Sequence, residues 1–209
     1  MTALILPKTR LLALTLVGLA AATPVLAHHP MGGMTPATFT QGLLSGFGHP
    51  IIGLDHLAAL IGVGLVASRF ARGLTLPAFW IVAMAAGVGL HLMSANLPYA
   101  EILVALSVVA IGLAATIRIT LPYGLIAVLF AAGGAVHGYA LGESIVGAEA
   151  TPLAAYLVGL VAVQTALTTA VAFAARSLAK GSLAAPALRL AGVAVAVTGV
   201  AALALPAFA

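Results

Sequence analysis

Apolar residues are arranged along this chain in six long runs, separated by short polar or proline-containing stretches. The runs cover residues 50–68, 74–93, 98–117, 122–142, 152–175 and 187–207. Each is close to the roughly 20 apolar residues that a helix needs to cross the hydrocarbon core of a bilayer. Prolines fall near the expected helix starts, where a missing N–H costs little. The pattern predicts an all-α polytopic membrane helix bundle with six transmembrane helices.

The composition agrees with lipid as the main solvent of this surface. Of 209 residues, 63% are hydrophobic and 6% are charged, whereas about 25% of a typical soluble domain is charged. The formal net charge of +4 is too small to indicate nucleic acid as a partner. The chain has no cysteine, which excludes disulfides, iron–sulfur clusters and thiolate metal sites.

The first 27 residues have the pattern of a secretory signal peptide. Lys8 and Arg10 form a basic start, the apolar stretch 11–22 follows, and small residues within 25–27 fit a cleavage site. We therefore expect this leader to be cleaved. An uncleaved first membrane helix is the alternative.

The chain after the leader is expected to have two parts. Residues 28–37 form a periplasmic tail rich in His and Met, and residues 38–209 form a single six-helix transmembrane domain. His28 and His29 stand at the start of the tail, where they could capture a metal ion or belong to a disordered end.

The chain around the first span is too long for one straight crossing. The 33 residues from 38 to 70 would form a helix of about 50 Å, well beyond the bilayer core. Gly46, Gly48 and Pro50 interrupt this stretch. We therefore predict a short outer helix over 38–47, a break, and then the first span. A break at membrane depth is tolerated only where it lines a cavity or is buried in protein.

The charged residues of the loops are distributed unevenly. With the mature N-terminus outside, every basic residue after the leader falls on the cytoplasmic side: Arg69, Arg72, Arg118, Arg176, Lys180 and Arg189. The outer loops carry Glu143 and Glu149. This distribution follows the positive-inside rule. It predicts a multi-pass membrane protein with the mature N- and C-termini both outside the cytoplasm; the bacterial inner membrane, which would make both termini periplasmic, is implied only by the family resemblance described below.

Two polar motifs lie at the outer ends of predicted spans. His49, Asp55 and His56 begin the first span, and His137 and Glu143 end the fourth. Asp55 lies well inside an apolar run, and a carboxylate placed there normally faces the bundle interior with a partner and marks a pathway. Imidazole and carboxylate groups suit nickel, cobalt, zinc, copper(II) or iron(II). We predict these five side chains as metal ligands; a purely structural polar cluster is the alternative.

The spacing in the first motif restricts how its side chains can meet. In one continuous helix, His49 and His56 would share a face but lie about 10 Å apart along the axis, too far to bind one ion directly. A break at Pro50 would let His49 approach His56. Asp55 and His56 point in different directions, so one of them could orient an imidazole instead of binding metal itself.

Other polar residues are weaker metal candidates. His91 ends the second span and Glu101 begins the third. A helix–helix hydrogen bond is the alternative role for His91, and a solvated helix-start carboxylate is the alternative for Glu101. The fifth span carries a deeper polar patch that could hydrate an inward path or bond neighbouring helices: Gln164, Thr165, Thr168 and Thr169.

Small residues repeat along the fourth span. Gly134, Gly138 and Gly142 are spaced four apart, which lets two membrane helices approach closely. His137 lies beside this ridge. We therefore expect the fourth span to pack against another helix and to bring His137 near the first span.

The two histidine motifs, Gly48–His56 and His137–Glu143, resemble those of the HupE/UreJ family of bacterial nickel permeases, and the likeness covers most of the mature chain. One departure is Val136, which replaces the usual aromatic residue before the His-Gly pair. The resemblance implies uptake of nickel or cobalt across the inner membrane, supplying hydrogenase or urease maturation. It also implies transport-critical roles for five residues: His49, Asp55, His56, His137 and Glu143.

These observations predict a secondary permease rather than an enzyme. The chain contains no nucleotide-binding P-loop motif, and no permanently bound cofactor is expected beside the transported Ni²⁺ or Co²⁺. The expected partners are the metal ion and the bilayer, and a homo-oligomer is compatible with the pattern. Met31, Met34 and Met93 keep open a copper-handling or metal-sensing protein. A membrane metallohydrolase and a structural membrane subunit are the remaining alternatives, although no H-E-x-x-H motif occurs.

Overall fold

The computed structural model describes residues 34–117, 121–179 and 184–204. The predicted signal peptide and the tail residues His28 and His29 lie outside these ranges. The described residues form α-helices and two short 3₁₀ turns, without a β-strand among them. The helices are α2 (Phe39–Ile52), α3 (Leu54–Ala67), α4 (Leu76–Leu92), α5 (Ala100–Thr116), α6 (Tyr123–Gly142), α7 (Ala150–Leu178) and α8 (Ala184–Ala204). The 3₁₀ turns are η1 (Gly73–Thr75) and η2 (Glu143–Ile145). The prediction of an all-α protein is confirmed.

The helices differ in how clearly they are suited to crossing a membrane. Four have the necessary length and apolar composition, namely those centred on α4, α6, α7 and α8. The pair α2 and α3 passes the same test together but is bent by 78°. The apolar helix α5 has 17 residues, at the lower end of the roughly 17 to 25 residues of a spanning helix. The structure thus supports a membrane protein with four to five candidate spans, and six crossings stay a prediction.

The break before α3 lies three residues later than the last interruption expected from the sequence. The helix α2 runs through Gly46 and Pro50 and ends at Gly53, whose backbone is extended (φ −70°, ψ 109°). Gly46 serves close packing instead, because a Cβ built there would collide with the backbone carbonyl of Tyr156 on α7. Pro50 falls in the last turn of α2, next to the end that Gly53 provides. The prediction of a helix that stops at residue 47 is therefore wrong, whereas a short helix before a break is present.

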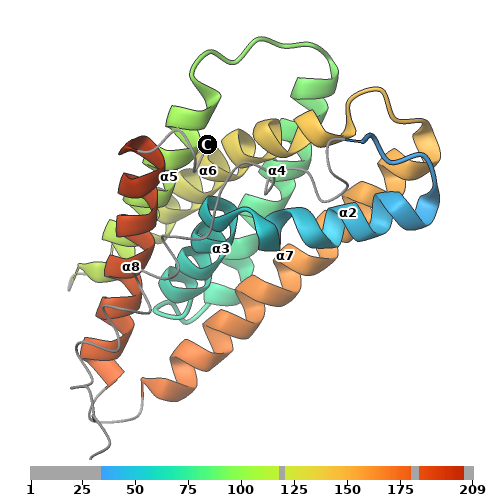
Figure 1. Ribbon diagram of the computed structural model, residues 1–209. Coiled ribbons are helices and arrows are strands. Elements are labelled where there is room, and N and C mark those ends of the chain that lie inside the picture. Colours follow the sequence, from blue (N-terminus) through green and yellow to red (C-terminus); the bar gives the residue numbers. More distant parts are fainter. Residues whose placement is uncertain (1–33, 118–120, 180–183, 205–209) are drawn as a thin grey trace, which may run out of the picture.

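Glycines bring the helices into contact in pairs. Gly134 and Gly138 of α6 face the backbone of Trp80 and Met84 on α4, so closely that a Cβ would collide with either carbonyl. Glycine contacts of the same kind join α5 to α8 and α2 to α7, and Figure 1 shows each pair running side by side. The predicted ridge therefore packs on the second predicted span, and the contact with the first span is made by His137 itself.

Arginine side chains form hydrogen bonds with the ends of neighbouring helices on one side of the bundle. Arg69 donates hydrogen bonds to the carbonyls of Ala114 (2.9 Å) and Ile117 (2.6 Å) at the end of α5. Arg176 of α7 likewise donates to the carbonyl of Phe70 (2.6 Å), just after α3. Cations at helix C-termini are favourable because the last carbonyls lack intrahelical partners. The ends of α3, α5 and α7 thus lie together, as the loop charges predicted.

Two apolar clusters fill the interior. The larger one joins the later part of α3 to α5, α7, α8 and the first halves of α4 and α6, on the side of the arginines. The smaller one joins the later parts of α4 and α6 to the first half of α7. Polar side chains from the motifs of α2, α3 and α6 lie between these clusters.

Candidate metal site

Four polar side chains that the sequence singled out are buried in the bundle. His49 of α2 is 4% exposed, Asp55 and His56 of α3 are each 6% exposed, and His137 of α6 is 1% exposed. The ring centroids of His49 and His56 are 5.8 Å apart, and those of His56 and His137 are 4.8 Å apart. Three imidazoles from three helices therefore form a cluster around His56.

The helix break accounts for this convergence. A straight helix would separate His49 and His56 by about 10 Å along its axis. The 78° bend between α2 and α3 turns His49 toward the first turn of α3. Gly53 is the pivot, and a Cβ there would lie 3.1 Å from the ring of His56 and 3.3 Å from the carboxylate of Asp55. The absence of a side chain at Gly53 leaves room for both.

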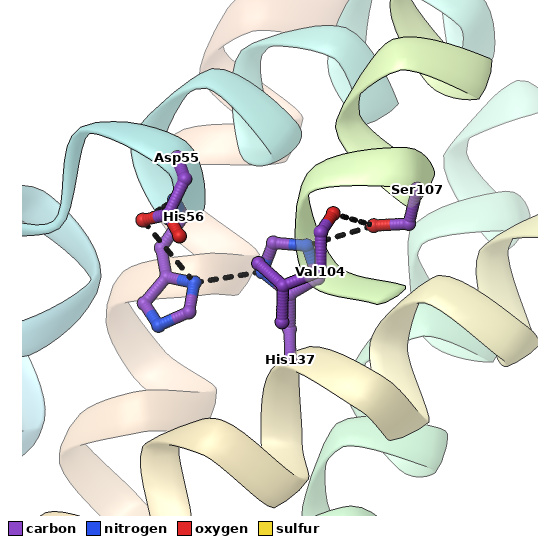
Figure 2. Close-up of polar contacts among 5 residues, drawn as sticks. All are labelled: Asp55, His56, Val104, Ser107 and His137. Atoms are coloured by element: carbon purple, nitrogen blue, oxygen red, sulfur yellow. Dashed lines mark hydrogen bonds and ion pairs between the residues drawn. The ribbon is translucent and has the colours of Figure 1, made fainter. Parts of the chain in front are cut away.

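His56 and His137 contact each other directly, as Figure 2 shows, with their Nδ1 atoms 2.7 Å apart. The Nε2 atom of His137 lies 2.9 Å from the hydroxyl of Ser107 on α5, which donates its own proton to the carbonyl of Val104 at 2.7 Å. Because a hydroxyl has one proton to donate, Nε2–H of neutral His137 donates to Ser107. His56 Nδ1–H then donates to His137.

Asp55 is bound mainly to the backbone. Its Oδ1 atom accepts a hydrogen bond from the N–H of His56 at 2.7 Å and lies 3.7 Å from the Nδ1 atom of the same residue. That N–H is one of the first donors of α3, which have no partner within the helix. A carboxylate in the first turn is also favoured by the helix dipole. Asp55 thus holds the start of α3 and places a negative charge beside His56.

His49 is held by two hydroxyl groups that the sequence analysis missed. Its Nδ1 atom lies 3.0 Å from the Ser144 hydroxyl and 3.2 Å from the Tyr156 hydroxyl. Tyr156 donates to the carbonyl of Leu141 at 2.7 Å, and Ser144 donates to Tyr156 at 3.0 Å. Both hydroxyl protons are then used, so Nδ1–H of His49 is the donor. Ser144 directly follows the second motif, and Tyr156 lies in the apolar fifth run, where little distinguishes it from a core aromatic.

Trp80 and Gln164 border the cluster on the side of the larger apolar core. The Trp80 ring packs against His137 with centroids 4.8 Å apart, and its indole N–H donates to the Gln164 side-chain oxygen at 2.8 Å. The threonines of the predicted polar patch behave differently. Thr165 donates to the carbonyl of Val161, and Thr168 donates to the carbonyl of Gln164 on their own helix.

The remaining predicted ligands do not join the cluster. Glu143 in η2 and Glu101 at the start of α5 are exposed. His91 packs against Tyr139, with ring centroids 4.5 Å apart, and its buried Nδ1 atom has no hydrogen-bond partner within the described residues. The described part of the chain holds no group of three or more His, Asp or Glu side chains arranged to hold a metal ion. The imidazoles are hydrogen-bonded to one another and to hydroxyls instead.

The fold and the cluster define a class: an apolar helical membrane protein with buried imidazoles and a carboxylate gathered at a helix break. A family model described as "HupE / UreJ protein" matches residues 14–202. The chain belongs to the HupE/UreJ family, which confirms the resemblance seen in the two histidine motifs.

One relative and the solved structures complete the comparison. The chain is 30% identical over 125 residues to "Protein HupE" of Rhizobium leguminosarum bv. viciae. The matched segment covers 59% of this chain and 63% of that relative, so the likeness spans less than two thirds of the relative. No solved structure matches the chain.

Proposed function

We propose that this protein is a secondary permease for a divalent transition metal, with Ni²⁺ as its main cargo and Co²⁺ as a second one. The observation that supports it best is the convergence of His49, His56 and His137 with Asp55 inside an apolar bundle. Imidazoles with a carboxylate suit these metals, and buried ionisable groups in membrane proteins mark ion pathways. Membership of the HupE/UreJ family favours nickel over other metals of this group.

The geometry suggests how the cargo is bound. A metal ion entering from the predicted periplasmic side exchanges water ligands for imidazole nitrogens. The negative charge of Asp55 offsets part of its charge. Since His56 and His137 share a hydrogen bond, an ion that binds both through Nδ1 has to replace that bond.

Entry needs no nucleotide hydrolysis in this scheme. A membrane potential of 100 mV, negative inside, favours inward movement of a divalent cation by about 4.6 kcal/mol. We place the protein in the bacterial inner membrane with six crossings and with the arginine-rich end of the bundle in the cytoplasm. Delivery of nickel for hydrogenase or urease maturation is the role that family membership favours.

Radioactive nickel uptake tests this function. The purified protein is reconstituted into liposomes, and ⁶³Ni²⁺ accumulation is compared with that of protein-free liposomes, with unlabelled cobalt, copper or zinc as competitors. We expect protein-dependent uptake that cobalt inhibits more strongly than zinc does. Transport of copper in preference to nickel would favour the copper-handling alternative. Absence of flux for all four metals from folded protein would contradict a permease.

A further inference from the structure

Trp80 forms the boundary between the histidine cluster and the larger apolar core. It is 1% exposed, and its ring packs against His137 at a tilt of 52°. Gly133 of α6 makes room for it, because a Cβ there would lie 2.8 Å from the Cζ3 atom of the indole. The ring therefore fills the space directly beside the cluster, on the side of the bundle where the arginines lie.

Gln164 is the partner of this ring, and its amide is only half satisfied. The side chain is 1% exposed, and its Oε1 atom accepts the indole N–H of Trp80. The Nε2 atom has no hydrogen-bond partner within the described residues. A buried donor without a partner destabilises the folded protein, so a leucine or methionine of similar size would be more favourable here. An unsatisfied group of this kind calls for a role outside the arrangement in which it is seen.

The chemistry of the amide indicates what that role is. Only its oxygen can bind a cation or accept hydrogen bonds from the water around one, since the nitrogen is a donor. In the present arrangement one of the two lone pairs of that oxygen accepts the indole N–H of Trp80. A rotation of the indole away from α7 would release Oε1 and, in the same movement, empty the space beside His137. Trp80 thus lies between His137, which its ring contacts, and Gln164, whose oxygen accepts its indole N–H.

We propose that Gln164 is a second binding station for the divalent cation and its water shell, covered by Trp80 when the path is closed. The station lies between the histidine cluster and the arginine-rich end of the bundle. This inference rests on the proposed permease function. It assigns a transport role to two residues outside the histidine motifs.

Two variants separate a cation station from a packing contact. Trp80→Phe keeps a ring beside His137 but cannot donate a hydrogen bond to Oε1. We expect nickel uptake to rise about two- to tenfold, which corresponds to the net free energy of the one hydrogen bond that no longer has to be broken. Gln164→Leu removes both the hydrogen bond to Trp80 and the proposed binding station, so we expect uptake to fall about tenfold or more. Equilibrium dialysis of the detergent-solubilised protein with ⁶³Ni²⁺ should show that Gln164→Leu binds fewer nickel ions per protein than the wild type does.

A third variant guards against a trivial loss of structure. Gln164→Glu retains an oxygen at this position, and we expect it to restore uptake that Gln164→Leu loses. If Gln164→Leu took up nickel as fast as Trp80→Phe does, Gln164 would not be a binding station. The same conclusion would follow if Gln164→Glu bound nickel but did not transport it. Failure of the wild-type protein to transport any metal would instead reject the permease function on which this inference rests.

Discussion

Asp55 combines two physical roles that a substitution can separate. Its carboxylate accepts the N–H of His56 at the start of α3, and it places a negative charge next to the imidazole cluster. The first role needs an oxygen acceptor, whereas the second needs a charge. Burial makes both important, because a buried N–H without a partner and a cation without a counter-charge are each costly in an apolar bundle.

We predict that Asp55→Asn lowers nickel uptake about tenfold or more, because the neutral amide cannot offset the charge of the metal ion. Its oxygen can still accept the N–H of His56, so the free energy of unfolding should change by less than about 1 kcal/mol. Uptake into proteoliposomes and thermal unfolding in detergent measure the two effects.

Asp55→Ala is the matched comparison for this prediction. It removes the acceptor as well as the charge, so we expect the same loss of uptake together with about 1–3 kcal/mol of lost stability. Nickel uptake by Asp55→Asn at the wild-type rate would show that Asp55 serves only the start of α3.

Close contact between α4 and α6 positions His137 against its neighbours. Gly138 adjoins His137, and a Cβ on it would collide with the carbonyl of Met84. This is a backbone contact, so the helices themselves must separate if a side chain is introduced. Any separation withdraws His137 from both His56 and Trp80, which its ring contacts.

We predict that Gly138→Ala destabilises the protein by about 1–3 kcal/mol, as overpacking at a tight contact does, and reduces nickel uptake. Gly124→Ala is the control on the same helix, because nothing lies within 4 Å of a Cβ there. It should keep full uptake and leave stability equal or higher, since alanine favours a helix over glycine. Thermal unfolding and uptake of both variants check this; equal stability of the two would contradict the role of the contact.

The approximate positions of the helices could be predicted because the length of apolar runs and the placement of prolines are local features of the sequence. The fourth predicted span, 122–142, differs from α6 by one residue at its start. The break was misplaced because the sequence does not show whether a glycine ends a helix or lets two helices pack closely. Gly46 permits contact with Tyr156, and that partner lies far away along the chain.

The site was predictable only in part for a similar reason. The histidines and Asp55 are conspicuous in apolar runs, so residue type alone identified them. Ser107 was missed because a serine or threonine hydroxyl in a membrane helix commonly bonds its own backbone, as Thr165 does. Tyr156 was missed because a tyrosine in an apolar run is hard to distinguish from a core aromatic. Glu143 was placed with the histidines from its motif, but the chain turns through η2 after α6 and leaves this carboxylate exposed.

The distribution of charge over the whole molecule determines how it sits in the membrane. Arg69 and Arg176 lie at the same end of the bundle, where they bond the ends of α5 and α3. The histidine cluster lies toward the opposite end. The positive-inside rule predicts that the arginine end faces the cytoplasm, which would place the cluster nearer the periplasm.

Labelling of introduced cysteines tests this orientation, since the chain has no native cysteine. Ala71 and Glu149 are both exposed and lie in loops at opposite ends of the bundle. We predict that a membrane-impermeant maleimide labels Glu149→Cys in intact spheroplasts, but labels Ala71→Cys only after permeabilisation. Labelling of Ala71→Cys in intact spheroplasts would show that the predicted orientation is wrong.

We propose that the buried imidazole cluster carries the metal across the bundle, and a comparison of nickel uptake by two histidine variants tests this. His56→Gln removes the imidazole at the centre of the cluster, whereas His91→Gln removes one that packs on Tyr139 outside it. We measure initial ⁶³Ni²⁺ uptake in proteoliposomes with equal amounts of folded protein. We predict that His56→Gln loses uptake by about a hundredfold, since loss of a group that only orients a metal ligand already costs about 10- to 100-fold, and that His91→Gln retains most of it. Wild-type uptake by His56→Gln would contradict it.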